Sequence, residues 1–187
     1  MSTMTANVQA TPRATAGSVY HVDTSRSRAT FNVGKRFLFV LPLTVAGTID
    51  RIAGTIFLDE SAPEHSRADL SFAVASITTG KVKRDTHLRS ADFFDAQRFP
   101  EITFSSRSIE AIDASAGHFR VTGDLSIRGT TLSETLDMRL LVGLGGPRIH
   151  ATATLDRRHY GLLWEHPLVV PGHEVQITVE LETLPGM

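Results

Sequence analysis

Four ionisable side chains lie within eleven residues of one another and could carry acid–base or metal chemistry. They are Asp85, His87, Asp92 and Asp95. A histidine beside carboxylates can hold a divalent cation or act as a general base. The spacing does not match the His-Glu-x-x-His zinc motif. A surface helix whose aspartates cap turns or pair with nearby arginines explains the same residues, so the sequence favours a structural role over a catalytic one.

Other common catalytic and cofactor motifs are absent from the sequence. No serine stands in Gly-x-Ser-x-Gly, and there is no Gly-x-Gly-x-x-Gly or Walker-type loop. The chain has no cysteine, which excludes disulfides and cysteine-based zinc sites. We therefore expect a protein that is not an enzyme and that requires no metal or cofactor for catalysis.

The composition is that of an ordinary globular protein. The chain has 187 residues, of which 41% are hydrophobic and 21% charged, which suits one folded domain. Its 19 basic and 20 acidic residues give a net charge of −1, so no overall field favours nucleic acid or an anionic membrane. No run of about 18 apolar residues occurs, so we expect no integral membrane segment.

The first residues differ in character from the rest of the chain. Residues 1–17 are small and polar and lack the apolar run of a secretory signal. We expect a disordered tail over 1–17 and one domain over 18–184. The expected location is cytoplasmic, or periplasmic or secreted if the chain is a processed form.

Most of the chain alternates apolar with polar residues, the period of a strand with one apolar face. Turn signals such as Arg128-Gly129, Gly143–Pro147 and Pro171-Gly172 separate the alternating segments. Lys81–Ala96 is charged and does not alternate, which predicts a short helix or helical turns. At least eight short strands indicate a barrel or sandwich. The expected strands are 19–22, 30–33, 44–49, 55–58, 69–77, 101–106, 121–127, 132–144, 148–155 and 175–181.

The interior of such a barrel could be packed or hollow. An eight-stranded barrel is just wide enough for side chains to fill it, or for one small ligand. Small inward residues such as Ala73, Gly123, Ala151 and Ala153 would leave space open. The residues alone do not decide between the two.

Four segments, in consistent order and spacing, resemble the YceI-like family of polyisoprenoid-binding proteins. The resemblance extends from about Tyr20 to Glu182, although the apolar stretch Arg36–Val45 and a tyrosine at position 20, where the family usually has tryptophan, depart from the pattern. The segments are RDTHLRSADFFDAQRFPEITFSS at 84–106, VTGDLSIRGTT at 121–131, LDRRHYGLLW at 155–164 and HEVQITVELE at 173–182.

The resemblance implies an all-β fold: an eight-stranded antiparallel, lipocalin-like barrel with a short helix covering one side. It also implies a bound isoprenoid lipid, such as a polyprenyl phosphate or a prenylated quinone, in an apolar lumen. Each buried methylene contributes about 0.8 kcal/mol, so a long chain needs little polar recognition. Arg84, His87 and Arg89 are expected at the mouth, where a phosphate or quinone oxygen needs donors. The expected apolar lining is Phe31, Leu70, Phe72, Val74, Phe93, Phe94, Ile102, Phe104, Val121, Leu125, Ala153 and Trp164.

The expected function is binding, storage or transport of a long isoprenoid. One alternative is an enzyme that acts on a small apolar substrate through His87 with Asp85 or Asp92, which requires these side chains to converge on the cavity. Another is a filled barrel that acts only through its surface. If Arg36–Val45 is exposed, its apolar side chains would favour a homodimer.

Overall fold

The computed structural model describes residues 17–37, 41–141, 145–164 and 169–186. The expected N-terminal tail, apart from Gly17, lies outside these residues, as do parts of the 36–45 and 143–147 segments. Within the described ranges, no helix has the length and hydropathy needed to cross a membrane.

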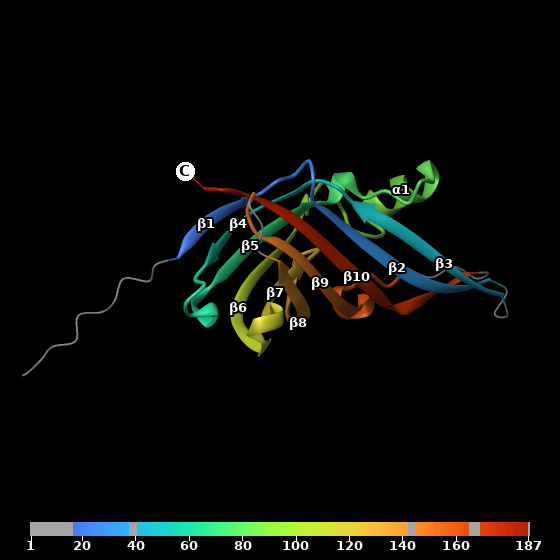
Figure 1. The fold of residues 1–187 in the computed structure, drawn as a ribbon. Coiled ribbons are helices and arrows are strands. Elements are labelled where there is room, and N and C mark those ends of the chain that lie inside the picture. The colour runs from blue at the N-terminus through green and yellow to red at the C-terminus, as the bar shows by residue number, and fades with distance from the viewer. Residues whose placement is uncertain (1–16, 38–40, 142–144, 165–168, 187) are drawn as a thin grey trace, which may run out of the picture.

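The described residues form ten strands and one α-helix. Figure 1 shows how these elements are arranged. The helix α1 (Val82–Arg89) lies within the segment expected to be helical, and turns follow it. Short 3-10 helices are η1 (Pro63–His65), η2 (Val74–Ser76), η3 (Ala114–Ala116) and η4 (Arg157–Tyr160). The strands are β1 (Ser18–Val22), β2 (Arg28–Phe37), β3 (Leu41–Ile49), β4 (Ile52–Leu58), β5 (Arg67–Ala73), β6 (Glu101–Asp113), β7 (His118–Ile127), β8 (Thr130–Leu141), β9 (Arg148–Asp156) and β10 (Val169–Pro185).

Eight of the strands close an antiparallel barrel, which confirms the predicted fold class. Their order is β1-β4-β5-β6-β7-β8-β9-β10, and the pairing of β1 with β10 completes the ring. The two further strands, β2 and β3, form a hairpin that pairs with the first part of β10. Because β10 has 17 residues, one of its edges pairs with β2 between Val169 and Glu180 and with β1 between Thr183 and Pro185.

Burial follows the alternation along the strands, so one parity faces the interior. On β6, Ile102 and Phe104 are buried, whereas Glu101, Thr103 and Ser105 are exposed. The same pattern holds on β8, where every second residue from Thr130 onward is partly buried. The apolar parity of each strand therefore lines the space inside the ring.

The helix covers the side of the barrel where β3 has no full partner strand. In the described chain, the outer edge of β3 meets only an isolated bridge between Thr48 and Thr78. Asp85 of α1 accepts hydrogen bonds from the Thr78 hydroxyl at 2.9 Å and the Thr79 backbone N–H at 2.8 Å. These bonds fix α1 beside β3, as seen in Figure 1.

Candidate functional site

The barrel encloses two adjoining chambers. The upper chamber, beside α1, has a volume of about 440 Å³, and the lower chamber has a volume of about 130 Å³. The interior is therefore hollow, which the residues alone left undecided. The chambers meet at a shared ring of side chains: Ala29, Ile49, Ile102, Ile127, Leu155 and Ile177.

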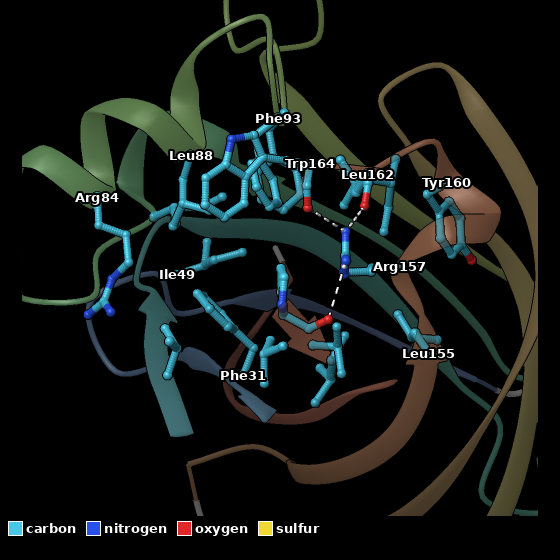
Figure 2. A pocket seen from close by; sticks show the side chains of 18 of the residues that line it. Phe31, Ile49, Arg84, Leu88, Phe93, Leu155, Arg157, Tyr160, Leu162 and Trp164 are labelled. Atoms are coloured by element: carbon cyan, nitrogen blue, oxygen red, sulfur yellow. Dashed lines mark hydrogen bonds between the residues drawn. The ribbon is translucent and has the colours of Figure 1, made fainter. Parts of the chain in front are cut away.

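Aromatic side chains cover the entrance of the upper chamber. Figure 2 shows Trp164 and Phe93 on the side of the helix and Phe31 on the facing strand. The His87 ring packs edge-on against Trp164, with ring centroids 5.0 Å apart, and against Phe93 at 5.7 Å. Edge-to-face contacts of this kind fix ring orientation. They join α1 to the segment that follows η4.

The charged residues that line the upper chamber are all cationic. They are Lys35, Lys83, Arg84 and Arg157, and no aspartate or glutamate of the described chain lines this chamber. Arg84 is held at the edge of the chamber by bonds from its Nε to the Thr79 hydroxyl at 2.7 Å and from its Nη2 to the Thr79 carbonyl at 3.2 Å. An anionic group at the mouth would meet no like charge in the chamber wall.

Arg157 is the main residue of this site that the sequence reasoning missed. Its side chain is buried at the start of η4. It donates to the carbonyl of Gly172 at 2.9 Å, to those of Trp164 and Pro171 at 3.5 Å, and to that of Leu162. Figure 2 shows this guanidinium at the chamber wall. The segment 155–164 resembles the YceI-like family, but its sequence does not distinguish the buried Arg157 from the exposed Arg158.

Tyr160 lies at a gap in the barrel wall, beside the first half of β8. β8 pairs with β9 only from Asp137 to Leu141, so its first half has no strand neighbour on that edge among the described residues. Tyr160, fully buried in η4, donates a hydrogen bond from its hydroxyl to Glu134 Oε1 of β8 at 2.7 Å. Burial raises the pKa of Tyr160 well above its usual range, and the bond to Glu134 raises it further.

The pair of Tyr160 and Glu134 predicts that the free energy of unfolding falls at alkaline pH. Because the folded state holds Tyr160 neutral, its contribution is fully present below about pH 10, the ordinary tyrosine pKa, and is lost as pH rises beyond it. The free energy of unfolding, measured in urea between pH 8 and pH 11, should fall less steeply for Tyr160→Phe than for the parent. Tyr20→Phe is the matched control. Equal slopes for the parent and Tyr160→Phe would show that Tyr160 ionises freely.

The lower chamber is lined by apolar side chains and by Glu134 of β8. Ala151 and Ala153 leave room on β9. Gly123 leaves none, because the Phe104 ring lies over it: a Cβ at this position would come within 2.6 Å of that ring. The Phe104 ring therefore fills the space that Gly123 would otherwise leave in the lower part of the barrel.

The structure places most of the expected lining residues at one of the two chambers. The upper chamber has Phe31, Arg84, His87, Phe93, Phe94, Ile102 and Trp164. The lower chamber has Leu70, Phe72, Ile102, Phe104, Val121, Leu125 and Ala153.

Two expected residues, Val74 and Arg89, line neither chamber and correct the sequence interpretation. β5 ends at Ala73 and the chain turns into η2, so strand parity no longer governs Val74, which packs in the core at 1% exposure. Arg89 lies one helical turn after Asp85 and donates from Nη2 to the Ile77 carbonyl at 2.6 Å. It holds the helix in place and does not face the mouth.

The acid–base cluster does not converge on the cavity. His87 lines the upper chamber, but neither Asp85 nor Asp92 does. Burial opposes ionisation of Asp85, yet hydrogen bonds from Thr79 and Thr78 outweigh it and keep the pKa of Asp85 below its ordinary value. Asp92 lies 3.7 Å from His87 with its side chain 74% exposed. No group of three metal-ligating side chains occurs within the described residues.

A closed antiparallel ring around an apolar cavity, with cations at its mouth, defines a lipocalin-like barrel. The chain belongs to the YceI-like family, because the model of the YceI-like domain matches residues 20–183.

Comparison with known proteins agrees with this assignment. Protein YceI of Escherichia coli O157:H7 is 34% identical over 95 residues, which are 51% of this chain and 48% of that protein. The match thus spans about half the length of this relative.

Solved structures share the fold at low sequence identity. BcnA from Burkholderia cenocepacia superposes with a TM-score of 0.74 at 22% identity, covering 86% of this chain and 98% of that chain. A polyisoprenoid binding domain from Saccharophagus degradans gives 0.60 at 16% identity, covering 89% and 98%. At these identities the likeness concerns the fold alone.

Proposed function

We propose that the protein binds a long isoprenoid chain, with the tail in the lower chamber and the polar end beside Lys35, Lys83 and Arg84. The observation that carries the proposal is the separation of polarity in the cavity. The cations line the upper chamber, whereas the lower chamber is lined almost wholly by apolar residues. Burial of a prenyl chain releases water from both chain and wall, so affinity grows with the number of buried carbons.

We propose a carrier or storage role in place of catalysis. His87 is packed between Trp164 and Phe93, and its nearest carboxylate, Asp92, faces solvent. A carboxylate orients a histidine base through a hydrogen bond of about 2.6–3.2 Å, and the contact of 3.7 Å between His87 and Asp92 is longer than that. Among polar ends, a prenyl phosphate suits the cationic mouth, and a prenylated quinone is the second candidate because its oxygens accept hydrogen bonds.

Trp164 provides a direct test, because it is the single tryptophan of the chain and lines the upper chamber. Titration with geranylgeranyl phosphate or a prenylated quinone should change its emission and saturate at one ligand per chain. A linear alcohol of four carbons should produce no saturable change. If equilibrium dialysis and fluorescence both show no binding of either prenyl ligand, the proposal is wrong.

A further inference from the structure

Three exposed aliphatic side chains neighbour residues that line the upper chamber, either in the sequence or across a strand pair. Val82, at the start of α1, is 82% exposed and directly precedes the lining residues Lys83 and Arg84. Leu163 is 62% exposed between Leu162 and Trp164, which also line the chamber.

The third, Leu43 of β3, is 42% exposed. It pairs in register with Lys35 of β2, and paired residues of neighbouring strands point to the same face. Because Lys35 lines the chamber, Leu43 also faces the mouth. We call Lys35, Leu43, Val82, Lys83, Arg84 and Leu163 the mouth rim.

The mouth rim contains three cations, Lys35, Lys83 and Arg84. Among the described residues, neither Lys35, Lys83 nor Arg84 forms an ion pair. Two described carboxylates on or after α1 have other partners: Asp85 accepts bonds from Thr78 and Thr79, and Asp92 lies 3.7 Å from His87. The rim is therefore cationic although the whole chain carries a net charge of −1.

Among the described residues, the opposite end of the barrel also carries exposed aliphatic side chains, but no lysine or arginine lines the lower chamber there. β8 starts near the mouth, because Arg128, in the turn before it, donates to the Ala91 and Gly161 carbonyls at 2.6 and 3.0 Å. Its last residue, Leu141, therefore lies at the far end and is 62% exposed there. The far end also exposes Ile112, next to Asp113 and close to the ion pair of Glu110 with Arg120 at 3.6 Å.

We propose that the mouth rim docks on an anionic lipid bilayer, so that the cavity opens onto the membrane surface. Aliphatic side chains insert into the interface, while lysine and arginine reach the lipid phosphates. Each such cation contributes attraction near an anionic leaflet. This contact goes beyond the binding of the isoprenoid itself. It gives a prenyl chain a route between bilayer and barrel with little exposure to water.

Vesicle co-sedimentation tests this proposal. The protein should bind vesicles of phosphatidylcholine with phosphatidylglycerol, bind pure phosphatidylcholine much less, and lose binding as salt rises. Lys83→Glu should weaken the partition coefficient by at least about fivefold. The double variant Val82→Ser/Leu163→Ser should weaken it about tenfold.

Leu141→Ser is the matched control, because Leu141 and Leu163 are equally exposed at opposite ends. It should leave vesicle binding unchanged. Equal losses in the control and rim variants, or no preference for anionic vesicles, would overturn the proposal. The proposal would also be overturned if size-exclusion chromatography showed a dimer that dissociates only in the mouth-rim variants. The Trp164 titration on the double variant and on Leu141→Ser, which change no residue that lines a chamber, separates this result from failure of isoprenoid binding.

Discussion

Ala153→Trp is expected to lower the affinity for a prenyl chain about a hundredfold while the barrel stays folded. Ala153 lines the lower chamber, whose volume is about 130 Å³, and an indole ring at this position occupies that space. Filling an apolar cavity contributes about 24 cal/mol per Å³, so loss of this chamber removes about 3 kcal/mol, or a factor of about a hundred. Competition against the Trp164 signal is not suitable here, since the variant adds a second tryptophan. Equilibrium dialysis with radiolabelled geranylgeranyl phosphate measures the change.

The control is Thr154→Trp, on the same strand but with the opposite parity and exposed to solvent. It adds an equal ring outside the barrel and should leave affinity unchanged. Unaltered binding in Ala153→Trp, with a native circular dichroism spectrum, would place the tail outside the lower chamber.

Arg157→Leu is expected to lower the free energy of unfolding by about 3–5 kcal/mol. The guanidinium donates to four carbonyls in the segments that flank the mouth, those of Leu162, Trp164, Pro171 and Gly172. A leucine leaves these carbonyls without their donor, and each buried polar group that loses its partner costs about 1–3 kcal/mol. Urea unfolding followed by circular dichroism gives the value.

Arg158→Leu provides the neighbouring control. Arg158 is exposed and pairs with Asp156 at 2.6 Å, and an exposed ion pair contributes little to stability. Its midpoint in urea should stay close to that of the parent. Similar shifts for both variants would mean that Arg157 does not anchor the mouth.

The strands and the barrel could be predicted from the sequence because burial follows period 2. Ile102 and Phe104 show this directly: their parity alone indicates the interior face. The β2–β3 hairpin could not be placed, since the alternation in β10 says which face is buried and not which strand lies beside it. The position of Val74 was predicted wrongly because the 3-10 helix η2 begins at this residue and ends the alternation of the strand.

The aromatic part of the site was largely predictable, through the resemblance more than through the residues, whereas Arg84 alone was expected among the four cations that line the upper chamber. His87, Phe93 and Trp164 meet at the mouth although 71 positions separate Phe93 from Trp164. The polar contacts were not predictable. Glu134 has inward parity on β8, but its partner Tyr160 lies 26 positions away on η4, and only the fold brings the two together.

The most direct test of the account is organic extraction of the purified, folded protein, followed by mass spectrometry of the extract. The parent should yield about one isoprenoid molecule per chain, and Ala153→Trp isolated in the same way should yield much less. Repeated preparations of folded protein that yield no isoprenoid, and that take up no added geranylgeranyl phosphate or prenylated quinone, would contradict it.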